Sequence, residues 1–90
     1  MTSKTTPSFR QRFAALPPDI QEQARAAYRR FRNDPKHPSL HFKVIKRRGL
    51  TLHSARIGLH YCALAYVGGD ALYWFWIGPH AEYDHVIDKL

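Results

Sequence analysis

The sequence has only one cysteine and no long apolar run. Because Cys62 has no second cysteine with which to form a disulfide, the chain is typical of a reducing compartment. The opening residues, MTSKTTPSF, lack the apolar core of a secretory signal, and no stretch approaches the roughly 18 apolar residues that span a bilayer. We therefore expect a cytoplasmic protein with no membrane partner.

Several catalytic motifs are also missing. The sequence contains neither a Gly-rich phosphate loop nor a Ser-based catalytic constellation. His60 next to Tyr61-Cys62 suggests a thiol nucleophile, but Cys62 lies in an apolar strand pattern and is expected to be packed. Four potential metal ligands on one short helix point in different directions, so we expect no metal site and no cofactor. They are His80, Glu82, Asp84 and His85.

Acidic residues are few, and the charge is unevenly distributed. Seven Asp and Glu stand against 14 Lys and Arg, which gives a net charge of +7. Residues 1–56 carry +10, whereas residues 57–90 carry −3. A half-basic small protein is typical of one that binds a polyanion, either nucleic acid or an acidic protein segment. The alternative interpretation is that the surplus cations only keep the domain soluble.

Two helices are predicted near the start of the chain. The first has its apolar face at Phe9, Phe13 and Leu16, at helical spacing, and ends at the Pro-Pro pair that follows. The second begins after a cap at Asp19. Its apolar stripe has the same period and comprises Ile20, Ala24, Ala27, Tyr28 and Phe31.

Strand patterns follow the helices. Short extended runs begin at Phe42 and at Leu52, on either side of a charged turn at residues 46–49. Residues 61–67 and 71–77 are apolar at successive positions, so both faces of each strand are apolar, and a Gly-Gly-Asp turn separates them. This pattern predicts a hairpin that is covered on both faces.

The end of the chain predicts a short helix. Gly78 and Pro79 are expected to end the last strand, and residues 80–90 can then form a helix. At 90 residues and 44% hydrophobic content, the chain has room for a single domain, residues 1–90. The predicted fold class is α+β: two N-terminal helices packed on a small antiparallel sheet of three to four strands, with a short C-terminal helix.

Two long segments carry a resemblance to a known family. They are LPPDIQEQARAAYRRFRNDPKHPSLHFK, residues 16–43, and HSARIGLHYCALAYVGGDALYWFWIGPHAEYD, residues 53–84. In the order of their features they resemble the RelE/ParE family of bacterial type II toxins, and the ending IG-x-H-x-E-Y-D looks RelE-like. The match runs from Phe9 to about Ile87, nearly the whole chain.

The resemblance implies a toxin that is held by a cognate antitoxin protein, which would lay a helix or an extended segment over the sheet. Many RelE-like members cleave mRNA in the ribosomal A site without metal, so it implies a ribosome-dependent endoribonuclease. ParE-like members act on DNA gyrase, which leaves gyrase inhibition as the alternative, beside a weakened member acting by antitoxin and operator binding. A basic RNA-binding domain without a toxin role is a third interpretation.

The sequence departs from the family pattern in two places. Tyr61-Cys62 stands where the family has Tyr-Arg, so an arginine expected to hold a phosphate is replaced. The N-terminal strand of the family is expected to be missing or very short, because Pro7 and the first helix come so early.

Metal-free RNA cleavage requires a base, an acid and cations around the phosphorus. His80 stands where relatives carry His or Arg and can give or take a proton near neutral pH; Arg56 can hold the scissile phosphate. Tyr83 can donate a hydrogen bond or stack on a base, and Glu82 or Asp84 can orient His80 or act as the base. The alternative is structural: a helix-flanking histidine, a packed tyrosine and carboxylates that favour a helix N-terminus.

Six further residues are predicted to bind RNA. The basic ones would contact flanking phosphates or ribosomal RNA, and the alternative for them is a solvated charged turn. The six are Lys43, Lys46, Arg47, Arg48, His60 and Tyr61.

Overall fold

Helices and strands occur in blocks along the chain. The computed structural model describes residues 2–90. Short 3-10 turns at Pro38–Leu40 and His80–Glu82 precede β2 and α3. The main elements, in order, are β1 (Thr2–Thr5), α1 (Pro7–Ala14), α2 (Pro18–Asn33), β2 (Lys43–Arg47), β3 (Leu50–Ile57), β4 (Tyr61–Gly68), β5 (Ala71–Pro79) and α3 (Tyr83–Asp88).

The first two helices begin at prolines, whose fixed φ suits the first helical turn. Thr6 caps α1, because its hydroxyl accepts a hydrogen bond from the Phe9 amide at 3.2 Å. The predicted cap at Asp19 is wrong: α2 already begins at Pro18, so Asp19 lies inside the first turn. There its charge still favours the positive end of the helix dipole.

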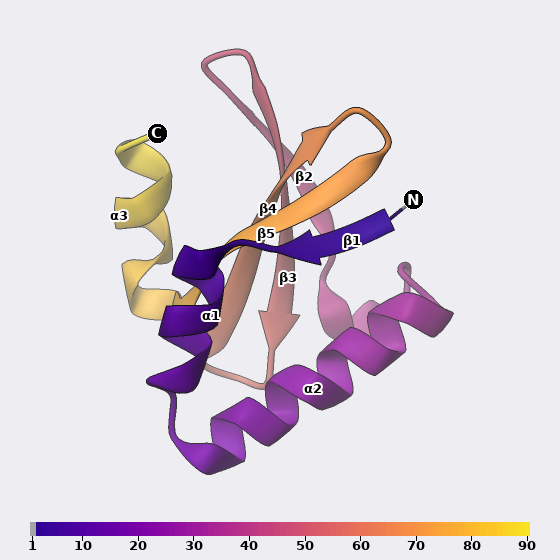
Figure 1. Ribbon diagram of the computed structural model, residues 1–90, viewed down its shortest axis with the longest axis vertical. Coiled ribbons are helices and arrows are strands. Elements are labelled where there is room, and N and C mark those ends of the chain that lie inside the picture. Colours follow the sequence, from indigo (N-terminus) through magenta and orange to yellow (C-terminus); the bar gives the residue numbers. More distant parts are fainter. Residues whose placement is uncertain (1) are drawn as a thin grey trace.

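The strands form one sheet in the order β1-β5-β4-β3-β2 (Figure 1). The α+β class is confirmed, but the sheet has five strands rather than three to four, and it is mixed, because β1 pairs in parallel with β5. The remaining neighbours are antiparallel, as predicted. The sequence TSKT of β1 has no apolar residue to bury, and the strand is fixed by backbone pairing at the sheet edge.

Two strand boundaries differ from the prediction. Gly78 and Pro79 do not end β5; they pair with Cys62 and Tyr61 of β4. A proline is tolerated there because β1 pairs with β5 only as far as Trp74, which leaves the other side of Pro79 without a strand partner. The charged turn is also shorter than expected, since β2 extends through Arg47.

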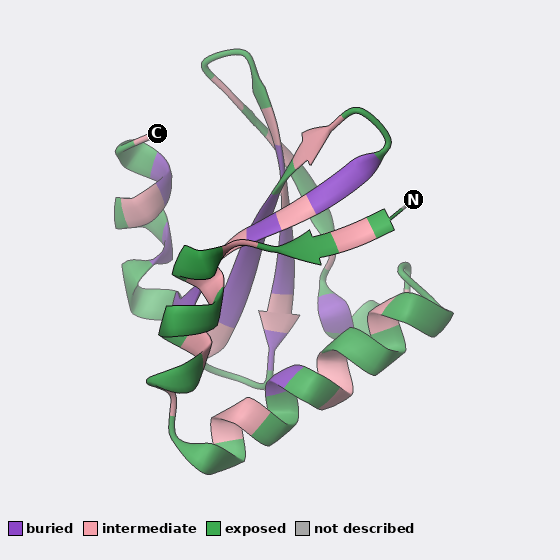
Figure 2. Ribbon diagram, viewed as in Figure 1, coloured by how far each residue is buried: buried purple, intermediate pink, exposed green. Residues whose placement is uncertain are grey.

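Each face of the sheet has its own core (Figures 1 and 2). The face covered by α1 and α2, called the helix-pair face, includes Ala55, Ile57, Ala63, Ala65, Leu72, Trp74 and Ile77. The opposite face, called the α3 face, is covered by Tyr83 and Ile87. Its sheet residues are Cys62, Leu64 and Trp76.

His53 on β3 makes folding sensitive to pH. Its ring lies 4.9 Å from the Phe42 ring, and its buried Nδ1 has no hydrogen-bond partner among residues 2–90. Burial lowers the pKa of His53 below its ordinary value of 6.5. Below pH 6.5 the unfolded chain therefore binds more protons than the folded one at this site, and stability falls as the pH decreases.

We expect the melting temperature to fall between pH 7.5 and pH 5, and to fall less in His53→Leu than in the unchanged protein. Thermal unfolding followed by circular dichroism at both pH values measures this. His85→Gln, which removes an exposed histidine, is the control. An equal decrease in all three proteins would contradict the assignment to His53.

Candidate active site

Four neighbouring strands, β2 to β5, bring basic and polar side chains together on the α3 face. Arg56 of β3 pairs with Cys62 of β4, and Cys62 pairs in turn with Gly78 of β5. One row further along, Lys43 of β2 pairs with Ser54 of β3. Because alternate residues of a strand share a face, Arg56, Ser54 and Lys43 all face α3.

Tyr83 lies over this group, and the side chains of His80 and Lys43 lie close to its ring. It is only 6% exposed and packs in the core of the α3 face. The His80 ring stacks against it, with centroids 5.5 Å apart and planes at 14°. The Lys43 Nζ lies 5.7 Å from the Tyr83 ring centroid. We call Lys43, Ser54, Arg56, His80 and Tyr83 the Tyr83 site.

The Tyr83 phenol is held in its neutral form. Burial raises its pKa, and Ser54 lowers it in part by approaching the hydroxyl. The hydroxyl is buried and makes no hydrogen bond of good geometry within residues 2–90. The neighbouring hydroxyls of Tyr83 and Ser54 make this a polar spot in the core of the α3 face.

Cys62 is packed beneath the site, as the apolar strand pattern predicted. It is 3% exposed, and burial raises the pKa of its thiol to about 11, although Arg56 and Lys43 act in the opposite direction. At neutral pH the thiol is therefore protonated and a poor nucleophile.

The other predicted catalytic residues lie around the Tyr83 site rather than within it. Asp84 is exposed and follows Tyr83 directly; its charge contributes to the raised pKa values of Tyr83 and Cys62. Glu82 is also exposed and lines a small cavity of about 160 Å³ against Arg12 of α1. The 3-10 turn thus carries Glu82 toward α1.

The six predicted RNA-binding residues are not brought together. Tyr61 packs against the core of the helix-pair face, because it alternates with Cys62 along β4. His60 lies in the exposed turn, where its carbonyl accepts a hydrogen bond from the His80 amide at 2.6 Å. Only Lys43 joins the Tyr83 site.

The remaining three lie at the far end of β2. Arg47 forms an ion pair with Asp88 of α3 at 3.5 Å. Lys46 alternates with Arg47 and faces the other side of the sheet. Arg48 is in the turn, with a positive φ of 52°. Ser54 was missed by the sequence analysis; the available signal was a small polar residue between Leu52 and Arg56 on the same strand face.

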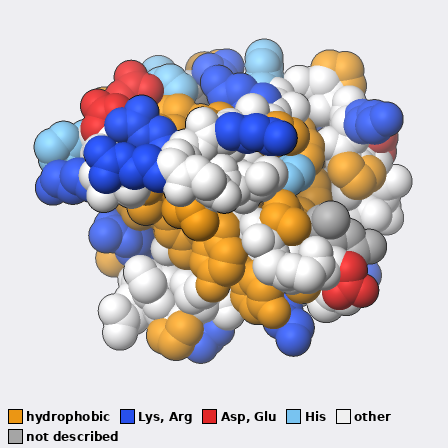
Figure 3. Space-filling view, turned by 90° about the horizontal axis from the view of Figure 1, so that it is seen from above, with side chains coloured by type: hydrophobic (Ala, Val, Ile, Leu, Met, Phe, Trp, Pro, Cys, Tyr) orange, Lys and Arg blue, Asp and Glu red, His pale blue; other side chains and the backbone are white. Residues whose placement is uncertain are grey.

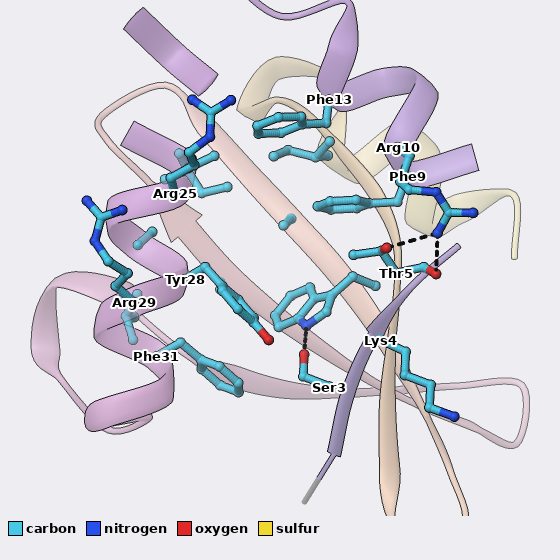
Figure 4. A pocket seen from close by; sticks show the side chains of 18 residues that line it. Ser3, Lys4, Thr5, Phe9, Arg10, Phe13, Arg25, Tyr28, Arg29 and Phe31 are labelled. Carbon is cyan, nitrogen blue, oxygen red and sulfur yellow. Dashed lines mark hydrogen bonds between the residues drawn. The ribbon is translucent and has the colours of Figure 1, made fainter. Parts of the chain in front are cut away.

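A groove lies on the helix-pair face, between α1, α2 and the β1–β5 edge (Figure 4). Its volume is about 670 Å³. Its walls are apolar, with Phe9 and Phe13 of α1 opposite Phe31 of α2. Arginines stand at its rim, and the Arg25 guanidinium lies 5.3 Å from the Phe13 ring centroid. The other basic rim residues are Arg10 and Arg29; Lys4 also lines the groove, but its amine lies over the Tyr73 ring on the opposite face.

Charged and apolar side chains are interspersed on the surface. Seen from above, Lys and Arg side chains stand with apolar side chains between them, and acidic side chains lie at the upper left and again at the lower right (Figure 3). Within residues 2–90, no three His, Cys, Asp or Glu side chains are grouped closely enough to hold a metal ion. None of the helices described is long and apolar enough to cross a membrane.

A family model matches most of the chain. It is the model of the ParE-like toxin domain, and it covers residues 18–85, from the start of α2 into α3. No curated protein matches the sequence.

Solved structures share the fold. The archaeal RelE–RelB complex from Pyrococcus horikoshii OT3 contains a chain with a TM-score of 0.67 and 16% identity, covering 87% of this chain and 92% of that one. The RelBE2 toxin–antitoxin complex of Mycobacterium tuberculosis gives 0.60 and 24%, covering 89% and 91%. A copper-bound mutant toxin from Helicobacter pylori gives 0.62 and 16%, covering 91% and 97%.

Proposed function

Because the chain belongs to the family of ParE-like toxin domains, we propose that it is the toxin of a toxin–antitoxin pair and that it cleaves mRNA on the ribosome without metal. The observation that carries this proposal is the Tyr83 site. It combines two cations, Lys43 and Arg56, with an exposed imidazole, His80, on one face of the sheet. Metal-free RNA cleavage needs these two kinds of group.

In the proposed reaction, the ribose 2′-hydroxyl attacks the adjacent phosphorus and the bond to the 5′-oxygen breaks. His80 takes the proton of the 2′-hydroxyl, the leaving 5′-oxygen takes a proton from water, and the hydroxide that remains takes the proton from His80, which restores both. The products are a 2′,3′-cyclic phosphate and a 5′-hydroxyl. Arg56 and Lys43 stabilise the charge that develops on the phosphoryl oxygens. Tyr83 acts as a positioning residue, since its ring lies against both His80 and Lys43.

Expression in bacteria without the partner gene tests the proposal. We expect growth to stop, translation to fall, and mRNA fragments with 5′-hydroxyl ends to accumulate at codons in the ribosomal A site. Primer extension and ligation that depends on a 5′-hydroxyl detect the fragments. Neither growth arrest nor fragments would contradict the proposal and would favour a plain RNA-binding domain.

Inhibition of DNA gyrase is a second candidate, and the ParE-like family model favours it. Cys62 also favours it, because a buried thiol stands where RelE-like relatives place an arginine. Broken chromosomal DNA with intact translation, in the same expression experiment, would support gyrase as the target.

The groove on the helix-pair face is the proposed site of the antitoxin. Two of the similar structures are complexes of a toxin with its antitoxin. The apolar walls suit the apolar stripe of a helix, and the rim of Arg10, Arg25 and Arg29 suits acidic residues beside that stripe. This assignment leaves the Tyr83 site on the opposite face.

Arg25→Glu is expected to weaken antitoxin binding about tenfold at low salt, mainly through slower association, and less at high salt. Surface plasmon resonance with the product of the adjacent open reading frame, at low and at high salt, measures the affinity and the association rate. Arg32→Glu makes the same change of charge on the same helix but outside the groove, and is the matched control. Equal weakening in both variants would mean that only net charge matters.

A further inference from the structure

An exposed group of aromatic side chains lies on the α3 face, away from the Tyr83 site. The rings of Tyr66 and Tyr73 are nearly parallel, at 18°, with centroids 5.2 Å apart. Phe75 lies 5.8 Å from Tyr66 at 40°. Tyr66 is 37% exposed, and neither its partner nor Phe75 is fully buried. We call Tyr66, Tyr73 and Phe75 the aromatic strip.

The strand register orders a row of side chains across the sheet. Lys4 of β1 pairs with Tyr73 of β5, and Tyr73 pairs with Tyr66 of β4. Lys4 and Tyr66 therefore flank Tyr73 on opposite sides. The Lys4 Nζ lies 6.0 Å from the Tyr73 ring centroid. On the far side of Tyr66 the row continues with Leu52, a buried aliphatic side chain, so Tyr66 is the last aromatic ring of the row and the more exposed end of it.

The aromatic strip shares its sheet face with the Tyr83 site. Cys62, Leu64 and Tyr66 alternate along β4, so all three point to the same side. Four residues of strand separate Cys62 from Tyr66, which is roughly 13 Å. Tyr83 and Ile87 of α3 cover Cys62 and Leu64, so a single strand of RNA with its phosphate at Arg56 would reach the aromatic strip by passing beside α3 on this face.

We propose that the aromatic strip is a base-stacking subsite for the single-stranded RNA that enters the Tyr83 site; the inference rests on the proposed function. An unpaired base stacks on Tyr66 and extends the row of rings, while Lys4 contacts a phosphate. Stacking of bases on aromatic side chains beside a cation is the usual way to hold single strands without reading their sequence.

The shape of the strip favours a base over a protein side chain. Tyr66, Tyr73 and Phe75 line neither the groove nor the small cavity. A protein anchor gains most of its binding energy by filling a pocket, whereas a base needs only a flat aromatic face and a nearby cation.

Binding of a 2′-O-methyl oligonucleotide that contains 2-aminopurine tests the proposal. This probe lacks the nucleophile, so binding is measured without cleavage, and 2-aminopurine fluorescence reports stacking. We expect Tyr66→Leu to bind about tenfold more weakly and to lose the quenching, and Tyr66→Phe to bind like the unchanged protein. Lys4→Ala should reduce the salt slope of log K by about 0.7.

Val44→Ala removes an exposed apolar side chain from β2, outside the strip, the Tyr83 site and the groove, and is the control. Thermal melting confirms that each variant is folded. Unchanged oligonucleotide affinity in Tyr66→Leu, or no measurable binding by the unchanged protein, would overturn the proposal. Weaker antitoxin binding with unchanged oligonucleotide binding would make the strip a protein surface instead. Failure of the proposed function would give a different result: no mRNA fragments would form, but the protein would still quench the 2-aminopurine fluorescence of the oligonucleotide.

Discussion

Replacing Arg56 by alanine is expected to reduce mRNA cleavage by about 10²- to 10³-fold and to relieve growth arrest. Arg56 is the cation of β3 that faces α3 beside Cys62. The residue after Tyr61 is Cys62 rather than an arginine, so no second guanidinium at that position can stabilise the phosphoryl charge. Removing a positioned donor from a developing oxyanion has an effect of this size in other enzymes. Cleavage of ribosome-bound mRNA by purified protein, at saturating ribosome concentration, measures the change.

Two further variants make this result specific. Arg56→Lys keeps the charge but not the planar pair of donors, so it should retain only part of the activity. Arg48→Ala removes an arginine from the exposed β2–β3 turn and should leave cleavage nearly unchanged. Similar toxicity of Arg56→Ala and the unchanged protein would show that Arg56 takes no part in the reaction.

The second large effect is expected from placing at Cys62 the arginine that the resemblance to the toxin family implies there. In this chain the thiol is covered by Tyr83 and Ile87 of α3 and lies between strands that already carry Arg56 and Gly78. A guanidinium there would be buried beside a like charge, so Cys62→Arg should lower the free energy of unfolding by about 3 kcal/mol or more.

Urea unfolding measures the loss, and Cys62→Ala, with an expected cost of about 1 kcal/mol, is the control for the lost side-chain volume. An equal stability of Cys62→Arg and the unchanged protein would show that α3 moves aside readily. On this expectation the role of Cys62 is structural: its small, buried side chain lets α3 pack on the sheet.

Much of the fold was predictable because periodicity reports burial. The apolar spacing of Phe9, Phe13 and Leu16 predicted α1, and the two apolar runs around Gly69 predicted the β4–β5 hairpin. β1 was not predictable in this way, since Thr2–Thr5 buries no apolar side chain and is held by its backbone.

The candidate site was predictable in part. The sequence indicated Arg56, His80 and Tyr83, which the sheet register and the 3-10 turn bring to one face. Strand alternation already separates Tyr61 from Cys62, and that signal was overlooked. The groove was beyond prediction, because it depends on how far α1 and α2 stand from the sheet.

α3 is anchored unequally at its two ends, which sets the order of its local unfolding. At its start, the His80 amide donates to the His60 carbonyl at 2.6 Å and ties the turn to the sheet. At its far end, Arg47 and Asp88 form an exposed ion pair, which contributes about 1 kcal/mol or less. We therefore expect local unfolding to begin at Asp88 and the residues after it, because Ile87 and Tyr83, both buried in the core of the α3 face, hold the rest of the helix on the sheet.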